Sequence, residues 1–424
     1  MVKRWLIGIV AVLLLLLAAG FWLNLRDEDP LSETAAFQPS AEQVQRGQYL
    51  ARAGSCASCH TARGGAAYAG GLGIQTPFGA VYTSNLTPDD GTGLGRWSPD
   101  HFWRALHNGR SRDGRLLYPA FPYPNYTRIT REDSDAIYAY LHSLPPVAQA
   151  NREHGLSFPF NTQLALGAWR ALFFTPKRNA VEPSRSAEWN RGAYLVEGLG
   201  HCNACHSARN VFGATTSGLD LSGGLIPIQN WYAPSLSAPD EAGLAAWSIE
   251  DIIALLSTGR SPHAAVMGPM AEVVYRSTQY LTPADAQAMA GFLKALPPTP
   301  ATPVKKDNRA ASWVLALGEK IYGQHCTQCH GDAGQGAPGA YPALAGNRAV
   351  TMASTANLIQ IVLNGGFAPA TPGNPRPYSM PPFVLTLNDG DIAAVLTHLR
   401  SSWGNQAAPV TELEVNRLRA TTQR

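Results

Sequence analysis

The chain has 424 residues, 45% of them hydrophobic, which is too long for one small core and predicts two to four domains. Forty glycines and 32 prolines indicate many turns and argue against a smooth helical bundle. The formal net charge is only +3 and the chain has no Lys/Arg run, so nothing in the sequence indicates nucleic-acid binding.

Residues 1–25 predict a membrane anchor. Lys3 and Arg4 precede an uncharged apolar stretch from Trp5 to Leu23, which as a helix would measure about 28 Å, close to the bilayer core of about 30 Å. The basic flank stays in the cytoplasm, so we expect an inner-membrane protein whose remaining residues face the periplasm. A signal peptide cleaved near Ala18–Gly20 is the alternative. The length of the apolar run favours the retained transmembrane helix.

All six cysteines fall into three Cys-x-x-Cys-His motifs: Cys56, Cys59 and His60; Cys202, Cys205 and His206; Cys326, Cys329 and His330. This spacing is typical of covalent attachment of haem c, because two thiols on one helical turn can bind one porphyrin and the next histidine can bind its iron. Redox-active cysteine pairs and disulfides do not explain a histidine after every pair, and a zinc site would need two pairs to converge, for which three is an awkward number. The sequence therefore predicts three haems c with three histidines as proximal ligands.

Each motif lies within a similar pattern. A glycine precedes it, an apolar helix ending in glycine follows it, and a helix with an N-cap residue and a carboxylate three positions later closes the unit. The caps are Thr130, Thr282 and Asn388. We predict a mainly α fold of three tandem class I-like cytochrome c domains at residues 40–148, 188–300 and 310–405 behind the N-terminal transmembrane helix.

Two connectors and a tail complete the chain. Residues 149–187 form a linker with an apolar helix near Leu164–Phe174, which we expect to pack domain 1 on domain 2; a surface for the bilayer or a partner subunit is the alternative. A proline-rich linker with Lys305 and Lys306 precedes domain 3. Residues 406–424 are polar, and we expect them to be disordered or ordered only by a partner.

Methionine often supplies the sixth iron ligand in such domains. Met380, on a proline-stiffened loop, is the candidate in domain 3, with Met352 as its competitor. Met270 is the candidate in domain 2, with Met267 and His263 as alternatives and Met289 expected in the core.

Domain 1 has no methionine after its motif, and Phe121 stands where one is expected. A phenyl ring cannot bind iron. Either this haem is five-coordinate or a histidine reaches it, with His107 to be tested before His101 and His142.

Residues 40 to 405 resemble the cytochrome c subunits of membrane-bound periplasmic dehydrogenases, such as the quinone-linked alcohol and the gluconate dehydrogenases. The resemblance rests on the three motifs and on the segments Asn85–Asp89, Gly93–Trp97, Leu117–Tyr123, Gly268–Met270 and Tyr341–Asn347. It implies His60, His206 and His330 as proximal ligands, and Met270 and Met380 as distal ones. Phe121 departs from the methionine common in this family, and the N-terminal anchor departs from the C-terminal anchor of the alcohol-oxidising branch.

The resemblance also implies a non-catalytic electron-transfer subunit. It would accept electrons from a catalytic subunit of the flavin, quinone or molybdenum type and pass them to ubiquinone or a terminal oxidase. The absence of a nucleotide-binding Gly-rich motif agrees with this. Two alternatives remain: a peroxidase-like haem enzyme acting at an open first haem, or a haem subunit of a terminal oxidase.

Overall fold

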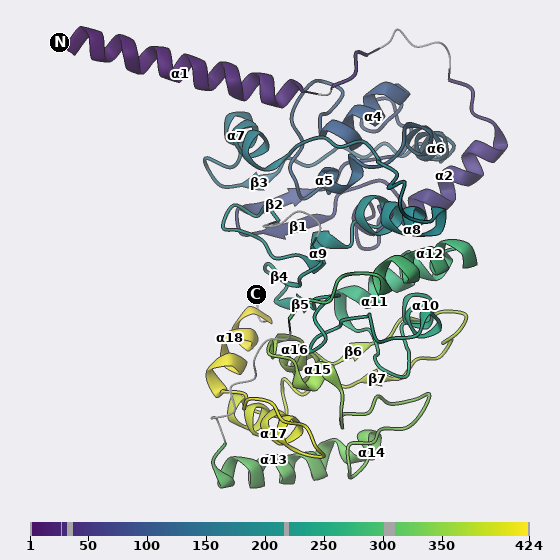
Figure 1. Cartoon of the computed structure of the whole chain (residues 1–424), viewed down its shortest axis with the longest axis vertical. Coiled ribbons are helices and arrows are strands. Elements are labelled where there is room, and N and C mark those ends of the chain that lie inside the picture. Colours follow the sequence, from purple (N-terminus) through teal and green to yellow (C-terminus); the bar gives the residue numbers. More distant parts are fainter. Residues whose placement is uncertain (1, 27, 32–36, 216–219, 301–309, 423–424) are drawn as a thin grey trace. The chain divides into compact units, whose positions relative to one another are not determined.

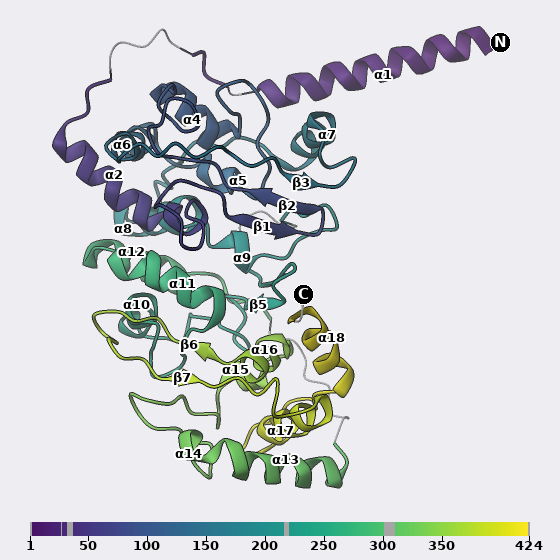
Figure 2. The same ribbon diagram turned by 180° about the vertical axis from the view of Figure 1, so that it is seen from behind.

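The computed structural model describes residues 2–26, 28–31, 37–215, 220–300 and 310–422. They form two compact units: unit 1 comprises Met1–Ser184, Tyr194–Ala204 and Asn210–Ala214, and unit 2 comprises Arg185–Ala193, Cys205–Arg209 and Thr215–Arg424. Helices dominate both units, and the sheets are small (Figures 1 and 2). The prediction of a mainly α fold is confirmed.

Helix α1 (Val2–Leu25) exposes large apolar side chains, among them Trp5, Phe21 and Trp22. Across the part of the chain that the structure describes, no helix combines the length and the apolar character needed to cross a bilayer.

The rest of unit 1 surrounds the first cysteine motif. A three-stranded antiparallel sheet has the order β1-β2-β3, with Ile74 opposite Val81 and Gly79 opposite Leu156. The other elements are helices: α2 (Ala41–Ala53), α3 (Cys56–Cys59), α4 (Pro99–Asn108), α5 (Tyr123–Tyr126), α6 (Arg131–His142), α7 (Gln163–Phe173) and the π-helix η1 (Tyr194–Leu199). The strands are β1 (Gly73–Thr76), β2 (Gly79–Tyr82) and β3 (Gly155–Leu156).

Unit 2 contains two further sets of helices with one two-stranded antiparallel sheet each, β4 paired with β5 and β6 with β7. In chain order its elements are α8 (Ala187–Ala193), β4 (Gly224–Ile226), β5 (Trp231–Ala233), α10 (Ile249–Thr258), α11 (Gly268–Arg276), the 3₁₀-helix η2 (Thr278–Tyr280), α12 (Pro283–Lys294), α13 (Ser312–His325), α14 (Thr327–His330), α15 (Arg348–Thr351), α16 (Ala356–Asn364), β6 (Gly366–Phe367), β7 (Ser379–Met380), α17 (Asp389–Ser401) and α18 (Glu412–Thr422). The short helix α9 (Asn203–His206) follows Cys202 and ends at the histidine of the second motif; its first two residues belong to unit 1 and its last two to unit 2.

One helix crossing occurs three times. The helix before each motif packs on the closing helix: α2 on α6, α8 on α12, and α13 on α17. We call the helices around these three crossings the first, second and third helix sets. At each crossing the earlier helix has a glycine whose Cβ, if present, would overlap a carbonyl oxygen of the closing helix. The distances are 1.8 Å from Gly47 to Ala136, 2.1 Å from Gly192 to Ala288, and 2.2 Å from Gly318 to Ala394. Only glycine lets these backbones approach so closely, which explains the glycine that precedes each motif.

The closing helices begin at the predicted caps. The side chains of Thr130, Thr282 and Asn388 accept hydrogen bonds from the backbone N–H groups of Asp133, Asp285 and Asp391, at 3.2, 3.2 and 2.9 Å. These bonds satisfy donors that the first helical turn leaves unpaired. Helices α4 and α10 end at Gly109 and Gly259, both left-handed, which confirms the predicted terminators.

The division into three domains stays a prediction, because the second and third helix crossings share unit 2. Residues 194–204 belong to unit 1, where Tyr194 Oη donates to Asp133 Oδ2 at 2.6 Å and Asn125 Nδ2 donates to the Glu197 carbonyl at 2.6 Å. Within the expected linker 149–187, the apolar segment forms α7. The proline-rich linker falls largely on residues 301–309, which lie outside the described residues.

The expectation of a disordered tail at 406–424 is wrong, because α18 (Glu412–Thr422) packs on the core of the third helix set. Val410 and Val415 are 5% and 0% exposed. Arg419 donates to Asp389 and to the carbonyl oxygens of Val384 and Leu387. A few apolar side chains on one helical face suffice to dock a segment whose overall composition is polar.

Candidate functional site

Each cysteine pair lies at a short helix, and in the second and third motifs the first cysteine comes directly before that helix. Cys56–Cys59 form α3, whereas α9 and α14 end at His206 and His330. In the first and third motifs the turn is closed by hydrogen bonds from the His60 N–H to the Cys56 carbonyl at 3.0 Å and from the His330 N–H to the Cys326 carbonyl at 2.9 Å. This geometry places two thiols on one side of the turn, with the histidine next to them. None of the six cysteines forms a disulfide.

The three motif histidines share one orienting contact. The Nδ1 of each donates to a backbone carbonyl: Ser84 for His60 at 2.7 Å, Pro234 for His206 at 2.7 Å, and Pro342 for His330 at 3.0 Å. A carbonyl oxygen can only accept, so Nδ1 carries the proton and Nε2 has the lone pair. A histidine that binds a metal usually has this arrangement.

The protonation of the motif side chains fits a haem site. Burial lowers the pKa of His60, His206 and His330, which keeps the imidazoles neutral. Burial, with the neighbouring thiol second, raises the pKa of Cys56 to about 12 and of Cys326 to about 11. Reactive redox cysteines have lowered pKa values, so these pairs differ from a thioredoxin-like site.

The described residues also contain no group of three or more His, Cys, Asp or Glu side chains that could hold a metal ion. Iron in a porphyrin needs only one or two protein ligands, so paired thiols with one oriented imidazole fit haem c at each motif.

The methionine candidates lie as follows. Met380 is in β7, where it pairs with Gly366 of β6 and packs against the apolar core of the third helix set. Its competitor Met352 is 6% exposed, and its carbonyl accepts from Arg400 at 2.9 Å, as expected of a core residue. Met270 is in the first turn of α11, against the buried Val266 and Val274.

The alternatives to Met270 have other surroundings. Met267 is the N-cap residue of α11, and its sulfur lies 3.3 Å from the position of a Cβ on Gly366. His263 has a half-exposed side chain that pairs with Asp251 at 3.2 Å. Met289 is 4% exposed within α12, so the prediction that it belongs to the core is confirmed.

The Phe121 loop adjoins the first motif through Tyr126. The rings of Phe121 and Tyr126 lie 5.4 Å apart, and the Tyr126 hydroxyl donates to the Gly54 carbonyl at 3.1 Å, two residues before Cys56. Burial and then the thiols of Cys56 and Cys59 raise the pKa of Tyr126 well above its usual value. The loop is therefore placed beside the first motif, as its sequence position predicts.

The three histidines considered for the first iron all have structural contacts. His107 is fully buried, with its ring stacked on Trp103 at 4.6 Å and its Nδ1 3.4 Å from Thr127 Oγ1. The Nδ1 of His101 accepts from the Ser98 N–H at 3.2 Å and so caps α4. His142 Nε2 donates to the Leu94 carbonyl at 3.1 Å.

Sequence reasoning missed the carbonyl partners of the motif histidines, because any residue type can supply a carbonyl. It also missed Tyr126 and Tyr322, whose hydroxyls donate to carbonyls next to the first and third motifs; Tyr322 bonds the Gly331 carbonyl at 2.5 Å. Pro342 lies in a segment that carries the family resemblance, and its place there was the only signal.

The helix crossings, the haem-attachment turns and the oriented histidines define a c-type cytochrome. The cytochrome c family profile matches residues 44–145 and 315–403. The chain is 40% identical to the cytochrome c subunit of the quinone alcohol dehydrogenase of Gluconacetobacter polyoxogenes, over 92% of this chain and 88% of that protein.

Two further relatives extend the comparison. The cytochrome c subunit of gluconate 2-dehydrogenase from Pantoea cypripedii is 40% identical over 89% of both chains. The fructose dehydrogenase cytochrome subunit of Gluconobacter japonicus is 34% identical over 97% of this chain and 88% of its own. The chain belongs to the family of dehydrogenase cytochrome c subunits, which carry covalent haem c and transfer electrons.

Proposed function

We propose that this chain carries three haems c and relays electrons from a catalytic dehydrogenase subunit to ubiquinone or a terminal oxidase. The observation that carries the haem number is the same contact at three places: His60, His206 and His330 each donate Nδ1 to a backbone carbonyl directly after a paired-cysteine turn. The family profile leaves the second motif outside its matched ranges, so the second haem rests on this geometry and on the motif itself.

In this proposal each iron has one imidazole ligand, and Met270 and Met380 complete the second and third sites. When bound, haem c supplies one-electron transfer. The carbonyl bond would fix the plane of the imidazole at each site, and Met270 and Met380 would supply the thioether sulfur that raises the potential at the second and third. The first site has Phe121 and no sulfur ligand, so we expect it to have the lowest potential of the three, whether it is five-coordinate or has a histidine as its sixth ligand.

The partner is proposed from the relatives, which are named as subunits of alcohol, gluconate and fructose dehydrogenases. We propose a catalytic subunit of the flavin, quinone or molybdenum type that oxidises its own substrate, while this chain performs no substrate chemistry.

We also propose that the chain acts at the inner membrane with both units in the periplasm. The exposed apolar side chains of α1 and the basic residues at its start support an attachment through this helix. Membrane fractionation and protease accessibility in spheroplasts test it: release of the chain by salt alone, or protection from external protease, would overturn it.

Intact mass of the purified chain tests the haem number. Three haems should add three haem masses to the polypeptide. The double substitution Cys202→Ala with Cys205→Ala should remove one of them and leave the others. An unchanged mass after this substitution would overturn the second haem, and six alkylatable thiols in the native chain would overturn all three.

Deletion of the gene tests the relay. Substrate-dependent respiration should be lost while the partner still reduces an artificial dye, because the catalytic subunit remains intact. Unchanged respiration would contradict the proposal.

Phe121 favours a second candidate function, a peroxidase-like haem enzyme at an open first site. Cyanide and peroxide distinguish electron transfer from peroxidase activity. If neither changes the spectrum of the first haem, that haem only transfers electrons, whereas rapid turnover of peroxide would support the enzyme.

A further inference from the structure

Helix α7 has a buried inner face and an exposed, apolar outer face. Its inner face carries Leu166 and Arg170, which are 5% and 3% exposed. Its outer face carries Leu164, Ala168 and Leu172 at a spacing of four residues, with both leucines 75% exposed. The only charged residue of the helix, Arg170, is thus turned inward. A helix that faces water normally presents polar side chains there, so this outer face requires another explanation.

Segments next to α7 in the sequence or in space also expose apolar side chains. Phe158 and Phe160 are 81% and 37% exposed, and Phe160 packs on Phe78 with ring centres 4.4 Å apart. Phe173 lies 5.9 Å from Phe212, which is 53% exposed. We call Leu164, Ala168, Leu172, Phe158 and Phe160 the apolar patch; exposed apolar side chains gathered in this way mark interaction surfaces.

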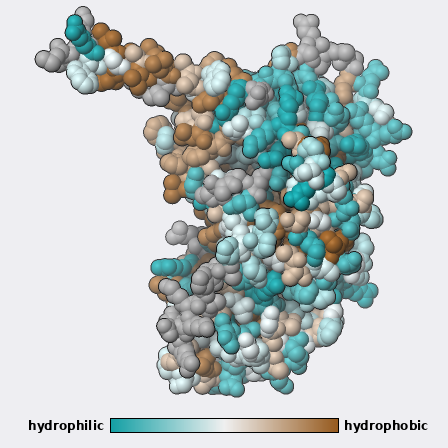
Figure 3. Space-filling view, in the orientation of Figure 1, coloured by the Kyte–Doolittle hydropathy of each residue, from teal (hydrophilic) through white to brown (hydrophobic). Residues whose placement is uncertain are grey.

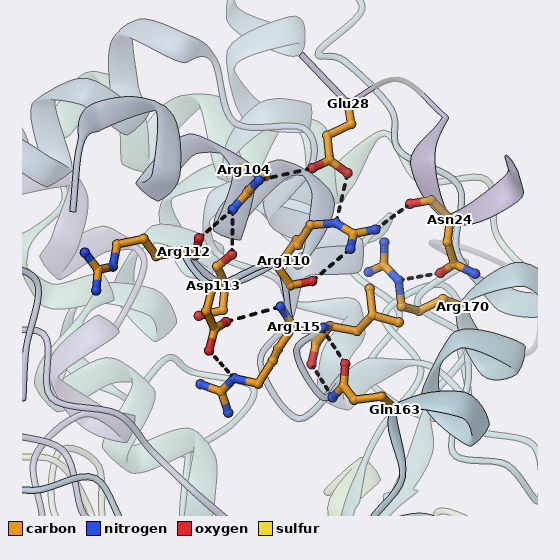
Figure 4. A network of polar contacts seen from close by, with 12 residues as sticks. Asn24, Glu28, Arg104, Arg110, Arg112, Asp113, Arg115, Gln163 and Arg170 are labelled. Atoms are coloured by element: carbon orange, nitrogen blue, oxygen red, sulfur yellow. Dashed lines mark hydrogen bonds and ion pairs between the residues drawn. The ribbon is translucent and has the colours of Figure 1, made fainter. Parts of the chain in front are cut away.

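The patch is fixed to the polar end of α1. Asn24 Nδ2 donates to the Gly167 carbonyl at 3.0 Å, and Arg170 Nε donates to Asn24 Oδ1 at 3.0 Å. Arg110 bonds the Asn24 carbonyl at 3.0 Å and Glu28 at 2.9 Å (Figure 4). These contacts hold α7 at the level where α1 changes from apolar to polar. Apolar colouring runs along α1 and continues on unit 1 beside this end (Figure 3).

The position of α7 at the end of the apolar length of α1 indicates what contacts the patch. The apolar length of α1 ends just before Asn24, so a lipid phase around that length ends at the same height. Helix α7 then lies where headgroups meet acyl chains, and leucine and aromatic side chains are favoured there. A protein partner would not need its contact surface to be fixed to the boundary of α1.

We propose that the outer face of α7, with Phe158 and Phe160, docks on the surface of a lipid bilayer. The proposal rests on the membrane attachment proposed above and deepens it: α1 attaches the chain, and α7 sets the height and tilt of unit 1 on the lipid.

Nitroxide labels test the proposal in the full-length holoprotein, in vesicles of phosphatidylethanolamine and phosphatidylglycerol. Covalent haem occupies the six native thiols, so a label reacts only with an introduced cysteine. The positions are Ala168→Cys on α7, Ala11→Cys on α1, and Ala41→Cys on α2 as an exposed control; α2 lies across unit 1 from α7 in both views (Figures 1 and 2). The readout is the ratio of collisions with oxygen, which concentrates in lipid, to collisions with a water-soluble nickel chelate.

We expect a severalfold higher ratio at residues 168 and 11 than at residue 41. The pair Leu164→Ser and Leu172→Ser should reduce the ratio at 168 and leave that at 11 unchanged. A low ratio at 11 would overturn the membrane attachment itself. A high ratio at 11 with a low one at 168 would overturn only the docking of α7, and protection of 168 in native membranes but not in lipid vesicles would assign the patch to a protein.

Discussion

The Nδ1 of His330 lies 3.0 Å from the carbonyl oxygen of Pro342, and His60 with Ser84 and His206 with Pro234 repeat this pairing at 2.7 Å. The carbonyls come 12 to 28 residues after their histidines, from loops of different length. A single electronic requirement, a neutral imidazole with its Nε2 available, is thus met by three local folds.

Met380→Leu should lower the potential of the third haem, because leucine fills the space without supplying sulfur. The spectrum of this haem should also gain a five-coordinate, high-spin component. Redox titration of the purified chain followed by absorbance measures both. The matched control is Met352→Leu, a buried methionine whose side chain is expected to serve only packing. If Met352→Leu gave the change and Met380→Leu did not, the assignment would be reversed.

Phe121→Met should raise the potential of the first haem and leave the other two unchanged, since it places a thioether in the loop that Tyr126 holds beside the first motif. Cyanide binding, if present in the parent chain, should weaken. A parent first haem that is already low-spin with two nitrogen ligands would contradict the five-coordinate interpretation; His107→Ala would then identify or exclude that histidine.

Gly318→Ala should destabilise the third helix set by about 1–3 kcal/mol, because the new methyl group overlaps the Ala394 carbonyl. Gly323→Ala in the same helix is the control, since no atom lies within 4 Å of its Cβ position. That change should be neutral or stabilise by up to about 1 kcal/mol. Guanidinium unfolding measures both; equal effects at the two positions would refute a steric role for the crossing.

Val415→Asp should destabilise the chain by about 2 kcal/mol or more, because it places a carboxylate at a fully buried position. Leu413→Asp, on the same helix at 57% exposure, should change stability by less than about 0.5 kcal/mol. Thermal unfolding of both variants provides the comparison. A tail that docks only on a partner would make the two substitutions equally harmless.

His142→Gln should weaken the dependence of stability on pH. Burial lowers the pKa of His142 in the folded chain, although the Leu94 carbonyl opposes this. The unfolded chain, with a pKa of about 6.5, then binds more protons, so stability falls as the pH drops from about 6.5 towards the folded pKa. Glutamine keeps a donor for Leu94 and does not titrate. Melting temperatures of parent and variant below pH 6.5 should differ in slope, and parallel curves would count against this role.

The sequence was sufficient for features that depend on local chemistry. The cysteine turns, the caps at Thr130, Thr282 and Asn388 and the helix ends at Gly109 and Gly259 each need particular residue types at fixed spacing. The family assignment followed from the same motifs.

Contacts between distant segments could not be foreseen. The carbonyls of Ser84 and Pro234 carry no side-chain signature, and the attachment of residues 194–204 to unit 1 depends on Asn125 and Asp133, far away in the chain. Helix α18 was misjudged because mean polarity hides a single apolar stripe, of which Val415 is the centre.

The helix crossings at the three glycines lie apart from the loops that we expect to determine the reduction potential at each motif. Gly47, Gly192 and Gly318 let the two helices of each crossing pack closely, outside the loops between each motif and its closing helix. These loops can include strands of a three-stranded sheet, as near the first motif, or have Phe121 where a methionine is expected. The helix crossing keeps the same geometry in both cases. We therefore expect the loops, and not the helix crossings, to determine the reduction potential at each motif, so that a loop exchanged between repeats should carry its potential with it.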